Sequence, residues 1–407
     1  MAEVRVHYSE CMIKKNKRKG ALQMMNKWST RDFPVGLYDL HPNVSINFQM
    51  NRFYNWTNDE DMLREMREAA RSIHSYEELV HSFIQLGNQA LEQDKKLKAA
   101  YYFRGGEFYL PEGNPKKQQL RKQFIALSTA HYGIAKEQHH LIPYENKFLS
   151  AYHISADNPK RTVVFFGGFD SYVEELLLMV MIFKGAGFDV VCFDGPGQGA
   201  ALEDYGLPFT HEWERPVSAV LDFFSLDNVT LIGMSLGGFL AVRAAAFEKR
   251  VKHVIAYDVL TNFFEVFMQQ VEPETREKLQ TLLADGQNEQ VNTALQQMAG
   301  KSLMIEWGLM QGMHITSSQT PAEFMRKTML YNTKDISSLL TQDVLLLVGQ
   351  EDHYVPLKQL NEQITSLTHV RSLTARMFTA KEHASNHCQI GNLGLAADVM
   401  LQWIGQF

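Results

Sequence analysis

The sequence predicts an α/β fold, in which a mainly parallel β-sheet is flanked by helices and carries a helical N-terminal region and a helical insertion. Short apolar runs alternate with helical stretches from about residue 147 onward, which is typical of parallel strands joined by crossovers. One run leads directly into a Gly-x-Ser-x-Gly motif at residues 233–237. About 85 residues separate Asp258 from Asp343, although a crossover needs only about a dozen. That surplus predicts the insertion.

Length and composition indicate a globular protein with a core of moderate size and an added lid. The 407 residues are 45% apolar and 21% charged, which excludes disordered and collagen-like classes. The net charge of -6 predicts no nucleic-acid partner. The basic cluster from Lys14 to Lys19 is expected to be a solvated loop, since no aromatic residues interleave it.

Cysteine usage and hydropathy predict a cytoplasmic protein without a membrane partner. The sequence has three cysteines, Cys11, Cys192 and Cys388. Such a small and odd number argues against a disulfide framework and fits a reducing compartment. The N-terminus has no apolar segment before its basic residues, so we expect no signal peptide. No run of 18 apolar residues occurs, so we expect no transmembrane helix.

Residues 1–145 are predicted to form a helical cap region. An apolar stripe at helical spacing runs from Met62 to Ile73, with Asn58 or Asp59 able to cap it. Ser75 and Glu78 have the spacing of a capping box. A further helix is expected over Lys98–Tyr109, before Pro111. We expect most of these stripes to serve helix packing, and the region to act as part of the lid.

Residues 146–407 are predicted to form the core, with a helical lid insertion at about 259–340. The insertion contains helical patterns at Glu274–Leu283 and Val291–Met298. The predicted strands are Phe148–Ile154, Val163–Phe166, Val190–Phe193, Val229–Ile232, Val251–Tyr257, Val344–Val348 and a last one near Arg376–Phe378. The predicted helices of the core are Glu174–Gly185, Trp213–Phe224, Phe239–Phe247 and Leu395–Trp403.

The strongest chemical signal is the sequence VTLIGMSLGG, which starts at Val229 and contains Ser235. A β-branched run, a Gly-x-Ser-x-Gly turn and a small-residue helix predict a sharp strand-to-helix turn that presents the serine hydroxyl. The flanking Gly233 and Gly237 relieve crowding in such a turn. Ser235 is therefore the predicted nucleophile, and the backbone N–H of Leu236 is a predicted oxyanion donor.

A serine nucleophile needs a histidine base and an orienting carboxylate, which in this topology follow it in the order acid, then histidine. Asp352 lies in the turn after a buried strand and is the predicted acid, and Glu351 is the alternative acid. A purely structural explanation of Asp352 would be an Asx-type turn. Two late histidines, His383 and His387, lie where the base is expected. Order along the chain does not choose between them.

Two glycine-rich loops follow strands of the core. The loop GGFDSY predicts a second oxyanion donor, the N–H of Gly168 or Phe169, because glycines let the backbone approach a substrate closely. The loop Asp194–Ala200 formally fits a dinucleotide-binding fingerprint. We reject that interpretation because no periodic helix is expected to begin there and Pro208 follows shortly after.

Together, the motifs resemble a known family. GGFDS, DGPGQG, GMSLGG, GQEDHYVP and HCQIGN resemble the α/β-hydrolase superfamily across about residues 145–407, which implies the α/β-hydrolase fold. With the helical N-terminal part, they are similar to the group of fungal polyketide-shortening hydrolases of the yellowish-green pigment type and bacterial 2,6-dihydroxypseudooxynicotine hydrolase. The resemblance implies cleavage of an ester or of a C–C bond next to a carbonyl. By match it implies Ser235 as nucleophile, Asp352 as acid and His387, directly before Cys388, as base.

These observations predict a serine hydrolase that works through an acyl-enzyme without a cofactor or metal, since no HExxH motif occurs. The expected partner is a small aromatic or apolar carbonyl substrate, with Phe264 and Trp307 lining its pocket and Glu265 able to protonate a departing carbanion. A homodimer is left open. The alternatives are a peptidase or thioesterase of the same fold, or a non-catalytic binding protein.

Overall fold

The computed structural model describes residues 27–407, so the basic cluster from Lys14 to Lys19 and Cys11 lie outside the described residues. It confirms the predicted fold class. One eight-stranded sheet has the order β1-β2-β4-β3-β5-β6-β7-β8, antiparallel from β1 through β2 to β4 and parallel from β4 to β8. The strands are β1 (His139–Tyr144), β2 (Lys147–Ile154), β3 (Thr162–Phe166), β4 (Asp189–Asp194), β5 (Val229–Met234), β6 (Val251–Tyr257), β7 (Asp343–Gly349) and β8 (Ser372–Phe378).

The interior strands are buried on both faces, which explains why their sequences are nearly continuous apolar runs. Every residue of β5 and β7 is buried. The edge strand β1, by contrast, alternates between exposed and buried positions and contains Pro143, which is tolerated at a sheet edge. No strand was expected at these residues, so the sheet starts before the expected boundary at residue 146.

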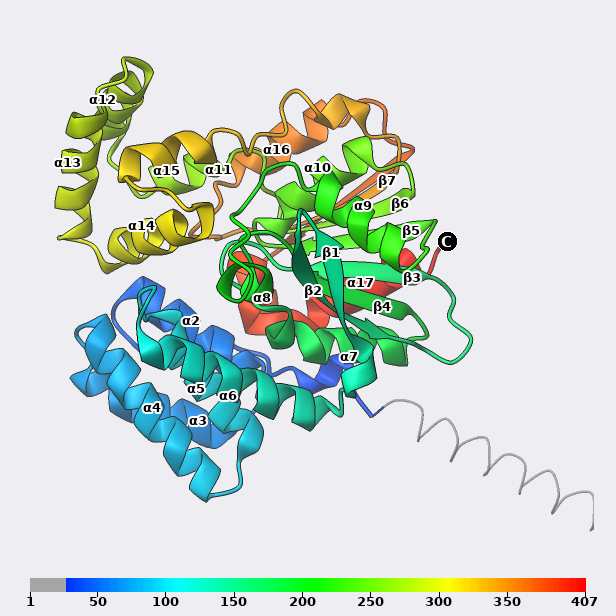
Figure 1. Cartoon of the computed structure of the whole chain (residues 1–407), viewed down its shortest axis with the longest axis horizontal. Helices are drawn as coiled ribbons and strands as arrows, with labels where there is room; N and C mark the ends of the chain where they lie inside the picture. The colour runs from blue at the N-terminus through cyan, green and yellow to red at the C-terminus, as the bar shows by residue number, and fades with distance from the viewer. Residues whose placement is uncertain (1–26) are drawn as a thin grey trace, which may run out of the picture.

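Helices cover both faces of the sheet and leave its carboxyl edge to the two helical additions (Figure 1). Side chains of α7 and α17 pack on one face with Phe165 and Cys192 of the strands. Side chains of α9 and α10 pack on the other face with Phe166 and Phe193. These core helices are α7 (Leu177–Gly185), α8 (Gly199–Glu203), α9 (Glu214–Phe223), α10 (Gly237–Phe247), α16 (Lys358–Ser366) and α17 (Leu393–Ile404).

The N-terminal helices, α2 to α6, form a separate layer against the first face (Figure 1). The predicted caps are present, since the Asp59 side chain accepts from the Asp61 N–H and the Ser75 side chain from the Glu78 N–H. Helix α5 is buried along nearly its whole length, which identifies it as the centre of this layer. The helices are α2 (Val44–Asn55), α3 (Glu60–Ala69), α4 (Tyr76–Glu92), α5 (Lys96–Phe108) and α6 (Pro115–Tyr132).

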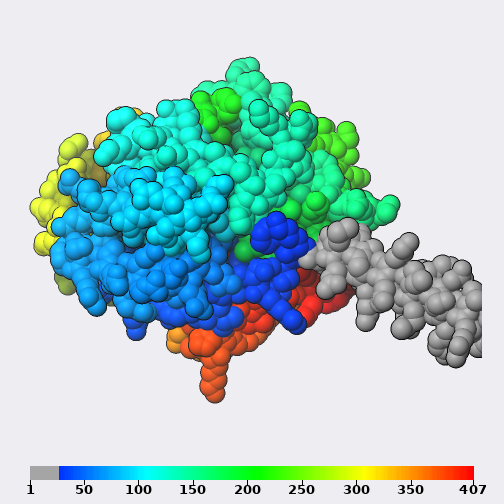
Figure 2. All heavy atoms as spheres, turned by 90° about the horizontal axis from the view of Figure 1, so that it is seen from below, coloured from blue at the N-terminus to red at the C-terminus, as the bar shows by residue number. Residues whose placement is uncertain are grey.

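The insert helices, α11 to α15, leave the core after β6 and return before β7. Figure 1 places them beside the N-terminal helices at the same side of the sheet, and Figure 2 shows the N-terminal helices covering much of one face, with the insert at its edge. The insert helices are α11 (Phe263–Met268), α12 (Pro273–Ala284), α13 (Asn288–Ala299), α14 (Leu303–Thr316) and α15 (Pro321–Thr328). Among residues 27–407, none of the helices has the length and apolar character needed to span a membrane.

Candidate active site

Ser235 lies in a tight turn between β5 and α10. Its φ is +62°, and its N–H donates to the carbonyl oxygen of Tyr257 over 2.5 Å. A Cβ on Gly233 would lie 1.8 Å from the carbonyl oxygen of Gly237, so only glycine fits there. The glycines of the motif therefore permit the turn, and the left-handed backbone of Ser235 is held in place by the neighbouring strand β6.

His387 is the histidine that the structure brings to Ser235. The Ser235 Oγ and the His387 Nε2 lie 2.8 Å apart, and the imidazole is buried. The ring of Tyr354 meets it edge to face, with centroids 5.1 Å apart. His383, four residues earlier, is exposed. Burial and contact thus distinguish two histidines that the sequence order could not.

Asp352 lies on the other side of the imidazole. Its Oδ2 is 2.7 Å from the His387 Nδ1, and its Oδ1 accepts the N–H groups of Tyr354 and Val355 over 2.7 and 3.0 Å. Asp352 therefore matches both interpretations of its sequence position, because it contacts the histidine and also forms an Asx-type turn. Glu351 is exposed and instead accepts a hydrogen bond from the Ser385 hydroxyl.

A second carboxylate, which the sequence analysis did not single out, also reaches this histidine. Asp258 directly follows β6 and is fully buried, with its Oδ2 3.1 Å from the His387 Nδ1. Its position directly after a predicted strand could have indicated it, because the carboxyl ends of parallel strands meet at one edge of a sheet. Asp258 follows β6 there, just as Ser235 follows β5 and Asp352 lies in the turn after β7.

The two carboxylates determine the charge state favoured by the imidazole. Burial by itself lowers the pKa of His387, but Asp352, Cys388 and Asp258 together raise that pKa well above its ordinary value. Burial raises the pKa of Asp258, and the hydrogen bond and charge of His387 outweigh it and lower that pKa. The site therefore stabilises a positively charged imidazole between two negatively charged groups.

The loop after β3 lies directly against the Ser235 turn. A Cβ on Gly168 would lie 2.7 Å from the backbone nitrogen of Leu236, so this glycine permits close approach of the two loops. The Gly168 N–H donates to the Ser171 hydroxyl over 3.3 Å. This bond distinguishes Gly168 from Phe169, the other predicted donor in the loop.

The loop at Asp194–Ala200 supports its neighbour rather than a dinucleotide. The Gln198 amide nitrogen donates to the carbonyl oxygens of both Gly167 and Gly168, each over 2.9 Å. A short helix, α8, does begin at Gly199, contrary to the sequence-based expectation. The Asp194 carboxylate occupies the space before it, since a Cβ on Gly199 would lie 1.9 Å from that group. The motif thus holds the loop after β3 in position.

A cavity of about 1250 Å³, part of it open to solvent, lies over Ser235 and His387. The core, the N-terminal helices and the insert helices all contribute to its walls, which are mostly apolar. Trp307 of α14 lines it and stacks on Phe108 of α5 with ring centroids 4.6 Å apart. The two helical additions are therefore in contact at the wall of the cavity.

Two other residues predicted to line the pocket lie elsewhere. Phe264 is buried among the apolar side chains of the insert helices. The Glu265 carboxylate pairs with the Lys358 ammonium group over 2.7 Å. Neither lines the cavity, because α11 turns its neighbouring residues Phe263 and Phe267 toward it instead.

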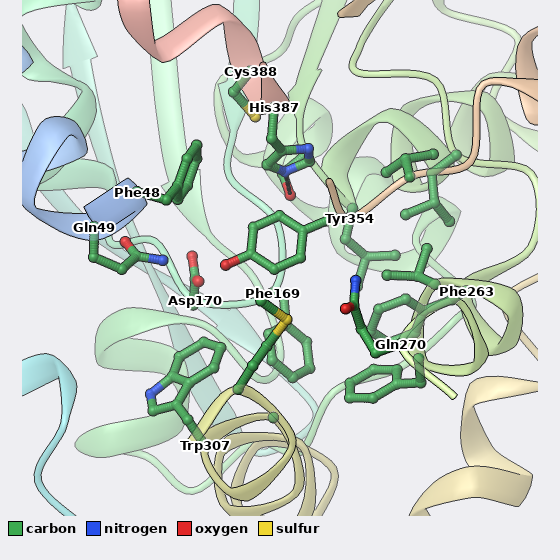
Figure 3. Close-up of a pocket in the computed structure, with 18 of the residues that line it drawn as sticks. Phe48, Gln49, Phe169, Asp170, Phe263, Gln270, Trp307, Tyr354, His387 and Cys388 are labelled. Carbon is green, nitrogen blue, oxygen red and sulfur yellow. Dashed lines mark hydrogen bonds between the residues drawn. The ribbon is translucent and has the colours of Figure 1, made fainter. Parts of the chain in front are cut away.

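One end of the cavity is polar. Figure 3 shows the side chains of Gln49 and Asp170 and the hydroxyl of Tyr354 pointing toward one another. Arg52 donates to the Gln49 oxygen over 3.2 Å and to the Asp170 carboxylate over 2.9 Å. Burial, followed by the charge of Asp170, raises the pKa of Tyr354 to about 12, so this hydroxyl keeps its proton at neutral pH.

The part of the chain that the structure describes contains one close group of metal-ligand types. Donor atoms of Asp258, His387 and Cys388 lie within 4.8 Å of one another. Both ring nitrogens of His387 already take part in contacts, with Ser235 and with Asp352. We therefore assign the group to the hydrogen-bonding network around His387.

The sequence is similar to a known protein family and to curated hydrolases. The alpha/beta hydrolase family matches residues 163–383, more than half of the chain. The hydrolase LUC6 from a Fusarium species is 27% identical over 346 residues, covering 76% of this chain and 80% of that protein. The 20-hydroxy-prefusarin hydrolase FUS2 from Gibberella moniliformis is 26% identical over 345 residues, covering 76% of this chain and 79% of that protein.

A solved structure shares the architecture. The crystal structure of 2,6-dihydroxy-pseudo-oxynicotine hydrolase matches with a TM-score of 0.59 at 18% identity, covering 87% of this chain and 94% of that one. Because the match covers most of both chains, it extends beyond the sheet to the helical additions.

Proposed function

The chain belongs to the alpha/beta hydrolase family and is a hydrolase, as its motifs predicted, and from this premise we propose that it cleaves its substrate through an acyl-enzyme on Ser235. One observation carries the proposal. The Ser235 Oγ lies 2.8 Å from the His387 Nε2, and the His387 Nδ1 lies 2.7 Å from the Asp352 Oδ2. This is the order of contacts that transfers a proton from a serine hydroxyl and stabilises the imidazolium that forms.

The proposed reaction has two halves. His387 takes the proton of the Ser235 hydroxyl as the Oγ attacks the carbonyl carbon, and then gives that proton to the departing oxygen or carbon. Water, deprotonated by His387, next attacks the acyl-enzyme and releases the acid. We assign the oxyanion to the backbone N–H groups of Leu236 and Phe169, since the Gly168 N–H already donates to Ser171.

We propose a small, largely apolar carbonyl compound as the substrate, either an ester or a β-diketone. The apolar walls support this class. The polar end, formed by Gln49, Asp170 and Tyr354, would accept a hydroxyl group of such a compound, and one curated relative is named for a hydroxylated substrate, 20-hydroxy-prefusarin. Helices α2 to α6 and the insertion at 259–340 would act together as the lid over the core, whose sheet begins with β1.

Labelling and kinetics test the nucleophile and the base. A fluorophosphonate probe should label the native protein and not Ser235→Ala, and hydrolysis of an aryl ester should fall by about 10⁴-fold or more in Ser235→Ala and His387→Ala. His383→Ala is the matched control, an exposed histidine of the same loop, and it should keep most activity. Full activity of Ser235→Ala, or loss only in His383→Ala, would contradict the assignment.

A substrate screen tests the bond that is cleaved. Aryl esters, thioesters, peptides and β-diketones of matched size would be compared by kcat/KM. We expect esters or β-diketones to lead, because the cavity offers apolar walls and one polar end. A clear preference for peptides or thioesters would favour the alternative activities of this fold.

A further inference from the structure

Two carboxylates approach the same nitrogen of His387. The Asp352 Oδ2 lies 2.7 Å from the Nδ1, and the Asp258 Oδ2 lies 3.1 Å from it. Side chains of both aspartates are almost entirely removed from solvent. Buried charges are unfavourable unless they are paired, so each carboxylate needs the imidazolium as a partner.

We propose that Asp258 is a positioning residue for His387, a second acid that orients the imidazole and shares with Asp352 the stabilisation of its charged form. The inference rests on the proposed function, since it assumes that His387 is the base. The His387 Nδ1 is hydrogen-bonded to Asp352, and Asp258 lies close enough, at 3.1 Å, to share its N–H. Each carboxylate then supplies part of the orientation that a single acid provides in the ordinary triad.

Asp258 also holds the backbone that carries the histidine. Its Oδ2 accepts the Cys388 N–H over 2.6 Å, and its Oδ1 accepts the Gln389 amide group over 3.0 Å. Cys388 and Gln389 have φ values of +52° and +50°, a conformation that is unfavourable for residues with side chains. The bonds to Asp258, together with the Tyr257 hydroxyl bond to the Cys388 carbonyl, compensate for that strain.

This second contact gives the histidine a support that comes from a different strand. Asp352 belongs to the turn after β7, and its Oδ1 accepts hydrogen bonds from the backbone of that turn. Asp258 lies at the end of β6, and its carboxylate accepts its other hydrogen bonds from the loop that carries His387. Loss of either acid therefore leaves the imidazole with one carboxylate and one anchor still in place.

The arrangement also has a consequence for pH dependence. The titratable groups around His387 are Asp352, Asp258 and Cys388, with His353 and Tyr354 next to it in the turn after β7. Both aspartates stabilise the protonated ring, so activity requires a pH above the raised pKa of His387. Removing one negative charge lowers that pKa, and the acidic limb of the rate profile then moves to lower pH.

The test compares Asp258→Asn, Asp352→Asn and the double variant in the full-length chain. Aryl-ester hydrolysis and the rate of fluorophosphonate labelling are measured between pH 5 and pH 9, roughly the range over which a histidine titrates. We expect each single variant to lose about 10- to 100-fold, against about 10⁴-fold for a triad with only one acid, and the double variant to approach the larger loss. Asp258→Asn should also shift the acidic limb to lower pH.

Glu351→Gln is the matched control, because this neighbouring carboxylate is exposed and does not contact His387; its profile should equal that of the native protein. An unchanged rate and pH profile in Asp258→Asn would overturn the proposal. If Asp258→Asn does not fold, Asp352→Asn alone decides, since a loss of about 10⁴-fold would assign all acid function to Asp352. Failure of the native protein to react with the probe would instead contradict the proposed function.

Discussion

The N-terminal helices and the insert helices both cover the cavity, but different side chains dominate their contacts near it. The N-terminal helices reach the core through a buried ionic network. Arg104 of α5 pairs with Glu175 and with Glu107 over 2.5 Å each, and Arg52 of α2 pairs with Glu175 over 2.8 Å. Lys117 of α6 completes it through Glu107.

The insert helices contact the loop after β3 through aromatic rings, and they also form the ion pairs of Glu265 with Lys358 and of His314 with Glu203. Phe169 of the loop after β3 lies with its ring centroid 5.5 Å from that of Phe263 and 5.9 Å from those of Phe267 and Trp307. Apolar contacts are non-directional, whereas charge-assisted hydrogen bonds fix geometry. We infer that the N-terminal helices form the fixed wall of the cavity and the insert helices the adaptable one.

The largest effect should follow removal of the fixed wall. A chain of residues 135–407 keeps every strand, yet it exposes the apolar surface that α2 to α6 cover and leaves Glu175 without its arginine partners. We expect insoluble or inactive protein, measured by size-exclusion chromatography and ester hydrolysis. A soluble, fully active 135–407 chain would show that the N-terminal helices are an independent appendage.

A single substitution in the ionic network should act nearly as strongly. Arg104→Met leaves Glu175 and Glu107 buried with fewer partners, and breaking a buried pair on one side costs about 3–5 kcal/mol. The denaturant midpoint should fall accordingly. Arg64→Met is the control, since the exposed Arg64 pair with Asp61 should contribute little to stability. Equal midpoints for the two variants would mean that the network does not fix this wall.

Much of this architecture could be predicted, because it follows from local pattern. Seven of the eight strands overlap the predicted strands, and the interior parallel ones were recognisable as apolar runs because they bury both faces. Ser235 was predictable because its turn needs glycines at fixed spacing. Chain order and a motif resemblance were enough to predict Asp352 and His387 as the partners of Ser235.

Other features depend on contacts between distant segments and were not predictable. Arg52, Arg104 and Glu175 form their network only after α2, α5 and the segment before α7 come together, and nothing in their separate sequences indicates pairing. The position of Asp258 at the carboxyl end of β6 could be predicted, but its contact with His387 depends on β6 lying between β5 and β7. Helical periodicity likewise places Phe264 and Glu265 on α11, but it does not say which face of that helix meets the cavity.

The adaptable wall should respond in specificity more than in stability. Phe267→Ala on α11 enlarges the cavity next to Phe169 while its half-buried ring contributes modestly to folding. We expect KM for a bulky aryl ester to rise about 10-fold, which corresponds to about 1.4 kcal/mol, with kcat nearly unchanged. A small acetate ester should show no change in KM. A fall in kcat for both esters would indicate that Phe267 supports the catalytic geometry itself.

The smallest effect is expected from Glu265→Gln, which asks whether the insert helices contribute chemistry or only shape. The sequence suggests Glu265 as a proton donor to a departing carbanion, but its carboxylate pairs with Lys358 at the outer side of α11. Both side chains are at least 30% exposed, and such pairs contribute about 0.2–1 kcal/mol.

We therefore expect the Glu265→Gln denaturant midpoint to change slightly and kcat on esters and β-diketones to stay within about twofold, a barrier change of about 0.4 kcal/mol. Lys358→Gln is the matched control, because it breaks the same ion pair from the side that bears no carboxylate. If Glu265→Gln alone lowered kcat on β-diketones by about 100-fold, the carboxylate would have to reach the substrate. The insert helices would then close over the cavity during turnover and supply a catalytic group, and the division into a fixed wall and an adaptable wall would fail at α11.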